Sequence, residues 1–507
     1  MATPGPTQLP YRVSPVIAGE SITDAASRSS YRRENPADVH QIVTDTVEAS
    51  LADVRAAVRA ARDIFDGPPA NWTQNTQLRR QVLLETGRLL RENTEALAQM
   101  MCLEIGMPIR LSRPHISAAA DVFEFYAGYV GKSYGSAIQL PDGSMIDMLR
   151  EPVGVVGIIV PWNFPFKQAA RKLAPALAVG CTVVVKPSPY TNACTQELIR
   201  ILAAAGAPDG VANFVPGASP EIGAALTADP GVDKISFTGS TGVGVMVQKS
   251  ASDTLKRTSL ELGGKNPCLV FEDADLAAAA NGLTFGMFLN SGQACGSVSR
   301  LIVHRSVHDE LLTRVEEILA GLRLGSPQDS VTSFGPVVAK SQQERILGFL
   351  DRARADGLSI RIGGGVPAGA AYSNGYFVEP TIVDDVPPTH ELAQDEVFGP
   401  VLAVLQFETD DEAVALANDT AFGLTAAIWT TDHARGLRVA RRVRAGTIWI
   451  NDNYQQNPEG IWGGYKMSGT GRELSPHGLY DMTEVKEIYS DGTGLAMKPL
   501  YRQVLND

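Results

Sequence analysis

Residues 153–188 read VGVVGIIVPWNFPFKQAARKLAPALAVGCTVVVKPS. An apolar run ending at Val160 is followed by helical spacing over residues 167–178 and by a second apolar run over residues 182–185. Two strands separated by a helix cannot be joined by a tight turn, so they pair in parallel within one sheet. The stretch therefore predicts an α/β fold in which helices cover a parallel sheet.

The same alternation continues to residue 263, with strand-like runs at 212–215 and 234–237 and helical runs between them. Before the stretch, residues 1 to about 45 are polar and rich in Pro and Gly, which indicates an arm or a few edge strands. Ser50 is placed as a helix N-cap, and a second helix is predicted over residues 76–104. Ligands of such sheets bind at the carboxyl ends of the strands.

After Pro267 a second alternation begins, in which LVF, LIVH, TIV, VLAVLQF and TIWI are short strands separated by helical stretches. This pattern predicts a second α/β domain. Residues 137–150 are extended, with a turn at Asp142 and Gly143. Such a hairpin either joins a neighbouring subunit's sheet or remains a surface ribbon, and the sequence leaves both open.

The composition excludes several classes of protein. A chain of 507 residues is long enough for two or three domains, and its net charge of −12 argues against nucleic-acid binding. We find no secretory signal and no run of about 18 apolar residues, so no membrane association is expected. The five cysteines show no CxxC spacing and the seven histidines are scattered, so neither disulfides nor a metal site is predicted. A cytoplasmic protein is the plain expectation.

Cys295 lies in NSGQACGSVSR, where small residues flank the sulfur on both sides. A nucleophilic thiol needs such room for the approaching substrate. A buried structural cysteine is the alternative, and this stretch alone does not choose between them.

Two further polar residues are candidates for chemistry. Glu261, in LELGGKNP, follows an apolar strand, where desolvation would raise its pKa and suit it to activate water. Asn163, in PWNFP, follows a strand and is able to donate to an oxyanion. A capping or salt-bridged Glu and a turn-stabilising Asn are the competing interpretations.

FTGSTGVG, at residues 237–244, follows a strand and opens a helix. Exposed N–H groups at a helix N-terminus can bind a pyrophosphate, although the spacing is not GxGxxG. Lys186 ends the strand TVVVK, where it could meet a ribose or phosphate or simply be solvated.

Taken together, these motifs and others in the same order resemble the aldehyde dehydrogenase superfamily. The resemblance spans about residues 35–490 and rests on PWNFP at 161, KPS at 186, FTGSTG at 237, LELGGKNP at 260, GQAC at 292, EVFGP at 396, GYKMSGTGRE at 464 and TEVK at 483.

The resemblance implies a mechanism. Cys295 would attack the aldehyde to form a thiohemiacetal, with Asn163 and the N–H of Cys295 holding the oxyanion. Hydride would then pass to the nicotinamide, leaving a thioester that water activated by Glu261 hydrolyses. Lys172 would belong to a proton relay.

The resemblance also implies a cofactor, NAD or NADP, and the residues that contact it. These are Trp162, Lys186, Ser188, Gly239, Ser240, Glu396 and Phe398, with Lys186 at the adenosine ribose, Gly239 and Ser240 at the pyrophosphate, and Glu396 at the nicotinamide ribose. Many NAD-preferring members carry a Glu three residues after the Lys, where this chain has Pro189. Because no further basic residue stands beside Lys186, NAD is slightly favoured.

A substrate pocket is implied around Phe164, Arg171, Leu289 and Trp462. Its aromatic and aliphatic walls favour an apolar or aromatic aldehyde. Arg171 leaves open a semialdehyde whose carboxylate it would bind, but Leu289 stands where such enzymes tend to carry a second Arg.

The family's architecture implies a Rossmann-like NAD(P)-binding domain (1–132 and 153–263), an α/β catalytic domain (264–480) and a small β oligomerisation element (133–152 and 481–507) in a homodimer or homotetramer. Three rival functions remain: an acylating enzyme that passes the thioester to coenzyme A, a catalytically idle binding or structural member, and a cofactor-free cysteine hydrolase. Glu261 argues against the first, and its presence together with Cys295, Asn163 and Glu396 argues against the second.

Overall fold

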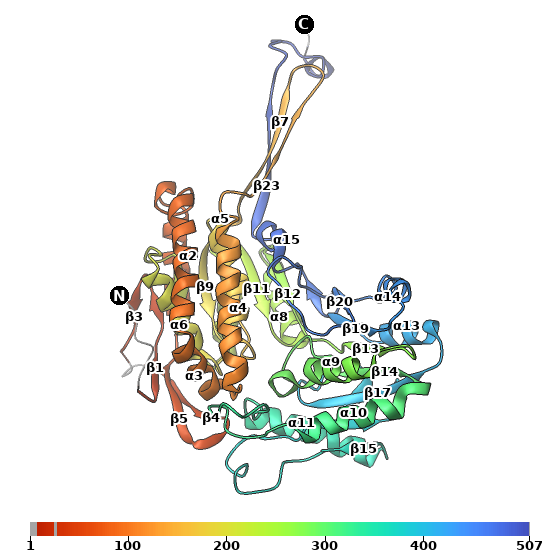
Figure 1. The fold of residues 1–507 in the computed structure, drawn as a ribbon. Helices are drawn as coiled ribbons and strands as arrows, with labels where there is room; N and C mark the ends of the chain where they lie inside the picture. The colour runs from red at the N-terminus through yellow and green to blue at the C-terminus, as the bar shows by residue number, and fades with distance from the viewer. Residues whose placement is uncertain (1–7, 25–27, 506–507) are drawn as a thin grey trace.

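The computed structural model describes residues 8–24 and 28–505, and it shows two sheets covered by helices and a long ribbon that projects from them (Figure 1). Residues 1–7, 25–27 and 506–507, which belong to the predicted domains, lie outside the described residues. The mixed α/β fold expected from the sequence is confirmed. The domain boundaries themselves stay a prediction.

The first sheet has a parallel centre flanked by antiparallel edges. Its strands lie in the order β22 (Gly469–Thr470), β12 (Arg257–Glu261), β11 (Lys234–Thr238), β8 (Val155–Ile159), β9 (Thr182–Lys186), β10 (Ala212–Phe214), β2 (Val16–Ile17) and β3 (Glu20–Ser21). The central strands match the predicted runs to within two residues. Edge strand β22 comes from the far end of the chain, which no local pattern indicates.

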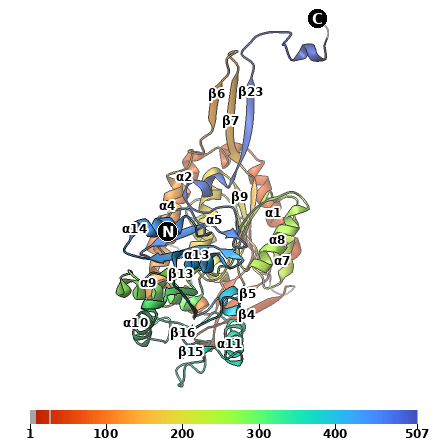
Figure 2. The same ribbon diagram turned by 90° about the vertical axis from the view of Figure 1, so that its right-hand side faces the viewer.

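Helices cover both faces of this sheet, as the two views show (Figures 1 and 2). One face carries α1 (Leu51–Phe65), α7 (Pro220–Ala228) and α8 (Thr241–Ser252). The other carries α5 (Pro165–Val179) and α6 (Asn192–Ala204), backed by α2 (Thr76–Glu92), α3 (Thr94–Ile105) and α4 (Ile109–Ala127). The central strands are consequently buried on both sides, which explains their continuous apolar sequence.

Local capping explains where two of these helices begin or end. Ser50 caps α1 as predicted, because its hydroxyl accepts from the Asp53 N–H while Asp53 accepts from the Ser50 N–H. The single helix predicted over residues 76–104 is wrong, since the chain breaks at Asn93 into α2 and α3. The Asn93 amide bonds back to the Leu89 carbonyl at 2.8 Å, which offers the backbone an alternative to continuing the helix.

The N-terminal arm forms edge strands, one of the two outcomes expected. A small sheet contains β1 (Tyr11–Val13), β5 (Asp38–Val47) and β4 (Ser30–Asn35), in that order. Strand β5 runs toward the first sheet, and the residues that follow it contact the loop after β10, where the Ala49 N–H donates to the Pro216 carbonyl at 2.8 Å.

The second sheet is also parallel, apart from edge strand β15. Its order is β15 (Ser359–Ile362), β16 (Thr381–Asp384), β17 (Val401–Phe407), β14 (Arg300–His304), β13 (Pro267–Val270), β19 (Thr425–Trp429) and β20 (Thr447–Ile450). One face packs on α9 (Leu276–Phe288) and α10 (His308–Ala320), and the other on α11 (Lys340–Ala355), α12 (Glu391–Gln394), α13 (Asp410–Asn418) and α14 (His433–Ala440). β18 (Phe422–Gly423) pairs separately with β21 (Tyr465–Lys466).

A ribbon projects from the body, and the C-terminal segment lies at its tip (Figures 1 and 2). It consists of β6 (Ser136–Gln139), β7 (Met145–Pro152) and β23 (Thr483–Ser490), which follows the short helix α15 (Ser475–Tyr480). The predicted hairpin is therefore present, and β23 adds a third strand to it. Across the described residues, no helix combines the length and apolarity needed to cross a membrane.

Candidate functional site

A cleft of about 300 Å³ opens where the carboxyl ends of β8 and β11 face the second sheet. It gathers residues from both halves of the chain. Its lining includes seven of the residues singled out from the sequence: Trp162, Asn163, Gly239, Ser240, Cys295, Glu396 and Phe398. It also includes residues that the sequence analysis missed, chiefly Gln342 and Arg345 of α11.

Cys295 follows a short segment with an unusual backbone. Asn290, Ser291 and Gly292 have φ values of 51°, 57° and 72°, a left-handed run that costs free energy for the two non-glycine residues. Surrounding contacts maintain it, since the Ser291 hydroxyl donates to the Gly335 carbonyl at 2.7 Å. At Gly292 a Cβ would collide with the backbone of Gly399, so only glycine fits there. The segment fixes the direction in which the chain enters the cysteine turn.

The Asn163 amide is held by that same segment. Its nitrogen donates to the Gln293 carbonyl at 3.1 Å, and the Asn290 side chain donates to the Asn163 carbonyl at 3.0 Å. An amide nitrogen carries two hydrogens, and among the described residues only one acceptor meets this one. A second N–H is thus left for an oxygen that enters the cleft beside Cys295.

Asn266 clamps the nucleophile turn from the other side. Its amide nitrogen donates to the carbonyls of Cys295 and Ser297, both at 2.8 Å, and its oxygen accepts from the Thr425 N–H at 3.0 Å. Its position in LELGGKNP was the only sequence signal for this role. Asn266 does not line the cleft, so its effect is to position Cys295.

Glu261 ends β12 and is buried, with no hydrogen-bond partner for either carboxylate oxygen within the described structure. Burial raises the pKa of Glu261 well above its usual value, and the charge of Glu473 raises it further. The surface or capping alternative is therefore excluded by the geometry. A desolvated carboxylate of this kind is a stronger base than an exposed one.

The thiol of Cys295, like the Glu261 carboxylate, has a raised pKa. Burial raises its pKa to about 12, and nearby Glu261, Glu396 and Glu473 add to the increase, while Arg171 opposes it. The protonated thiol therefore predominates near neutral pH, and the proton must be removed before attack. Glu261 is thus one of the charges that act on the Cys295 thiol.

Lys172 lies behind these groups, buried in α5. It forms an ion pair with Glu473 and donates to the Ser236 hydroxyl at 3.3 Å. The second carboxylate oxygen of Glu473 has no partner within the described residues. A buried chain from Lys172 through Glu473 toward Glu261 is consistent with proton movement.

One wall of the cleft has features that fit a dinucleotide. Ser240 caps α8 and lines the cleft, so the helix begins at this wall, and the buried hydroxyls of Thr238 and Thr241 have no partner among the described residues. Glu396 accepts from the Gly264 N–H at 2.9 Å, and burial raises the Glu396 pKa to about 7. A Cβ on Gly263 would collide with Glu396, so the glycine allows the carboxylate to reach this place.

The aromatic members of this wall also touch. The rings of Trp162 and Phe398 meet edge to face with centroids 5.4 Å apart. Lys186 and Ser188 lie at the carboxyl end of β9, outside the cleft lining. The Lys186 ammonium donates to the carbonyls of Pro187 and Gly217, at 3.0 and 3.1 Å.

The predicted substrate residues have more polar neighbours than expected. Arg171 is buried, bonds to the Gln456 side-chain oxygen, and stacks over the Trp462 ring at 5.1 Å. Phe164 packs between His115 and Tyr454, with centroid distances of 4.6 and 6.5 Å.

Leu289 is buried nearby and also lines a neighbouring hollow with Phe285 and Phe288. One turn before Arg171, Lys167 adds a second cation to α5, and burial lowers its pKa to about 7. Neither Lys167 nor His115 was recognised from the sequence.

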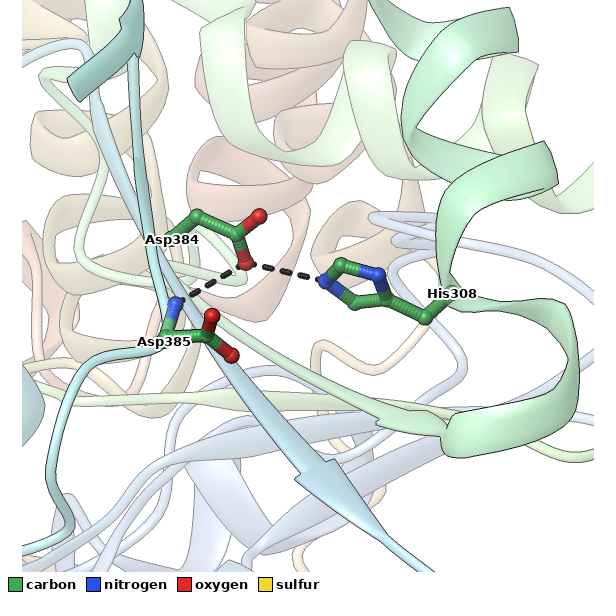
Figure 3. A group of neighbouring side chains, drawn as sticks. All are labelled: His308, Asp384 and Asp385. Atoms are coloured by element: carbon green, nitrogen blue, oxygen red, sulfur yellow. Dashed lines mark hydrogen bonds and ion pairs between the residues drawn. The ribbon is translucent and has the colours of Figure 1, made fainter. Parts of the chain in front are cut away.

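A second titratable cluster lies far from this cleft in the second sheet. His308, Asp384 and Asp385 bring potential ligand atoms within 4.8 Å of one another (Figure 3). Both imidazole nitrogens already contact carboxylates, Asp384 at 2.9 Å and Asp309 at 2.8 Å, and Arg361 donates to Asp384 at 3.0 Å. The cluster is an ion-pair network that joins α10 to β16, and we assign no metal to it.

A parallel sheet whose strand ends open toward a capped helix N-terminus is the framework of dinucleotide-dependent oxidoreductases. The sequence profile of the aldehyde dehydrogenase family matches residues 22–488. The chain belongs to this family and is an NAD(P)-dependent enzyme that oxidises aldehydes.

Individual relatives agree with this assignment. The chain is 38% identical over 457 residues to a betaine aldehyde dehydrogenase of Bacillus subtilis, covering 90% of this chain and 93% of the relative. It is 39% identical to an aminoaldehyde dehydrogenase of Pisum sativum, covering 90% and 91%. A crystal structure of an NAD-dependent aldehyde dehydrogenase from Sinorhizobium meliloti superposes with a TM-score of 0.93 at 39% identity, covering 96% of each chain.

Proposed function

We propose that the chain oxidises an aldehyde to its carboxylic acid through a thioester on Cys295. The second N–H of Asn163 and the N–H of Cys295 would stabilise the oxyanion when the sulfur attacks the carbonyl carbon. One such donor in a dry site lowers the barrier by about 3 kcal/mol. NAD or NADP, when bound, accepts the hydride. Glu261 then removes a proton from the water that hydrolyses the thioester.

The network around Asn163 carries this proposal. Its side-chain amide donates to the Gln293 carbonyl and its main-chain carbonyl accepts from Asn290, so nucleophile and oxyanion donor are built as one unit. Two basic groups serve the proton transfers: Glu261, with a raised pKa, and behind it the Lys172–Glu473 pair. A catalytically idle scaffold has no need of a buried, unpaired carboxylate, which destabilises the fold.

The cofactor would lie along the cleft wall described above. Gly239, Ser240 and the N-terminus of α8 would hold the pyrophosphate, and Glu396 with Phe398 and Trp162 would hold the nicotinamide end. Lys186 and Ser188 would meet the adenosine ribose at the end of β9. The donor set fits a dinucleotide because it combines N–H groups for phosphate with carboxylates for ribose hydroxyls.

The mechanism is tested by single-turnover kinetics of the wild type and two variants. Cys295→Ala should give no NAD(P)H. Glu261→Gln should release about one equivalent of NAD(P)H per site and stop, with an acyl adduct on the Cys295 peptide detected by mass spectrometry. A Glu261→Gln variant with full steady-state turnover would contradict the assigned base. Turnover that requires coenzyme A would favour the acylating alternative.

For the substrate, we infer that the aldehyde carries an anionic group at its far end. Arg171 is buried and Lys167 is partly buried one turn before it on α5, and the bonds described for Arg171 reach a neutral amide and a ring but no carboxylate. His115 lies close enough that both cations lower its pKa, after burial as the main cause. A buried Arg without a hydrogen-bonded acid partner is costly, and a substrate carboxylate would relieve that cost and favour the charged form of Lys167.

A semialdehyde with a carboxylate, the alternative that Arg171 left open, is thus preferred to an apolar or aromatic aldehyde. Aromatic walls from Phe164, Tyr454 and Trp462 remain compatible with an acid that also carries a ring. The aminoaldehydes and betaine aldehyde for which relatives are named bear positive charge, and the same cations would repel them.

Three aldehydes of similar size test the inference: 4-carboxybenzaldehyde, benzaldehyde and betaine aldehyde. The wild type should show kcat/KM about tenfold or more higher for the acid, because a charge-assisted pair is formed only with it. Arg171→Gln should lower that value about a hundredfold and leave benzaldehyde within threefold. Equal losses for both aromatic aldehydes would assign Arg171 a structural role and overturn the inference.

We also propose that the ribbon of β6, β7 and β23 joins subunits of a homodimer or homotetramer. Its faces expose apolar side chains that a monomer leaves in water: Ile138, Leu149, Val485, Ile488 and Tyr489. Its outer strands β6 and β23 are also unpaired edges within the described structure.

A further inference from the structure

Glu48 lies beside the carboxyl ends of β9 and β10, where Lys186 is proposed to meet the adenosine ribose. It follows β5, and its carboxylate Oε1 accepts from the Ala218 N–H at 2.5 Å. Ala218 and Gly217 belong to the loop after β10, the strand next to β9, and Lys186 ends β9. Because Lys186 donates to the Gly217 carbonyl, the ammonium and the carboxylate contact adjacent residues of one loop.

The charge of Glu48 also acts on Lys186. Burial lowers the pKa of Lys186 to about 8, and Glu48 is the charge that opposes this effect. Two of the three ammonium hydrogens are bonded to carbonyls, which leaves one for a ligand. Glu48 is only half-buried, and within the described structure its Oε2 has no hydrogen-bond partner. One donor and one charged acceptor therefore remain free at the same strand ends.

This pair distinguishes a ribose hydroxyl from a ribose phosphate. A 2′-hydroxyl can donate to a carboxylate, whereas a 2′-phosphate placed there brings two negative charges against a third. Pro189 has no group that could make this distinction, and its carbonyl only accepts from Tyr31 and Asn192. We propose that Glu48, supplied by the N-terminal arm, is the carboxylate that makes this enzyme select NAD over NADP.

The proposal rests on the cofactor placement of the proposed function, and calorimetry of the apo protein tests both without relying on turnover. Glu48→Gln is the informative variant because it removes the charge and keeps an oxygen for the Ala218 N–H. Asp38→Asn is the matched control, since it removes one negative charge at the opposite, exposed end of the same strand. Thermal melts of both variants establish that the fold is kept.

Wild type and Asp38→Asn should bind NAD about tenfold or more tightly than NADP. Glu48→Gln should reduce that ratio about fivefold or more, mainly by tightening NADP. If the wild type binds both cofactors and Glu48→Gln leaves their ratio unchanged, or if the wild type prefers NADP, the role of Glu48 is overturned and the dehydrogenase mechanism stands. If the wild type binds neither cofactor, the cofactor site and this proposal fail together.

Discussion

At the scale of single residues, the site combines reactive groups whose charged forms are disfavoured by their surroundings. Glu261 is buried and Cys295 is partly buried, and desolvation outweighs the nearby cations, so each carries a raised pKa. Proximity alone does not activate the thiol. The protein instead keeps the thiol protonated in the resting enzyme, which limits its reaction with other electrophiles at neutral pH.

This arrangement predicts the pH dependence of alkylation. Because the Cys295 pKa is raised to about 12, the thiolate fraction should still be rising throughout the range studied, so the iodoacetamide rate in the apo enzyme should increase about tenfold per unit between pH 7 and 10. Arg171→Gln removes the one cation that lowers this pKa and should slow the reaction at every pH. Peptide mass spectrometry separates Cys295 from the four buried cysteines. A plateau near pH 8 would contradict the assignment.

Asn266 gives a second prediction at this scale. Asn266→Ala removes three hydrogen bonds from buried backbone groups, so stability should fall by about 2 kcal/mol and kcat by about a hundredfold as the Cys295 turn loosens. Cofactor affinity, measured by calorimetry, should stay within about twofold because Asn266 does not line the cleft. An unchanged kcat would show that the turn is held by other contacts.

At the scale of elements, the His308 network connects the start of α10 to the end of β16. Burial alone would lower the His308 pKa, but its bonds to Asp384 and Asp309 raise it above the usual value. A raised native pKa means that the charged pair stabilises the fold fully below about pH 6.5, and that this contribution is lost as pH rises through the native pKa.

His308→Gln should therefore lower the melting temperature more at pH 6 than at pH 9, as measured by differential scanning fluorimetry. His433→Gln is the matched control, because His433 is exposed on α14. An equal loss at both pH values would mean that His308 contributes through packing rather than charge.

Sequence patterns predicted most central elements because each depends on neighbours along the chain. The strands β8 to β11 and the helices between them follow from apolar periodicity, and the α1 start follows from Ser50. The break at Asn93 was missed because Leu78, Val82, Leu89 and Leu97 keep a helical spacing across it.

The residues of the candidate site likewise fall into those that a local motif indicates and those that it does not. Cys295, Asn163 and Glu396 stand in recognisable local motifs, and the structure brings them to one cleft. Lys167, His115 and Glu48 matter through partners from distant segments, and local sequence carries no sign of those contacts. Tertiary packing, rather than any motif, defines the polarity of the substrate side and the charge beside Lys186.

At the scale of the whole molecule, the projecting ribbon should determine assembly. Replacing Val485 and Ile488 by Lys puts charge on exposed apolar positions of β23, and the double variant should elute as a monomer in light-scattering chromatography, with the wild type as a dimer or tetramer. Leu437→Lys, at an exposed position on α14, should leave the assembly intact. A monomeric wild type at micromolar concentration would refute the proposal.

Strand β22 has a consequence for how the chain is made. Glu261 ends a strand whose outer neighbour is Gly469–Thr470, and the Leu262 N–H bonds to the Ser468 carbonyl at 3.0 Å. While a ribosome is still translating the intervening segment, that edge of the first sheet has no partner for on the order of ten seconds or more. Glu261 thus reaches its final surroundings only after nearly all of the polypeptide has been synthesised. A nascent or truncated chain therefore cannot carry out the chemistry prematurely.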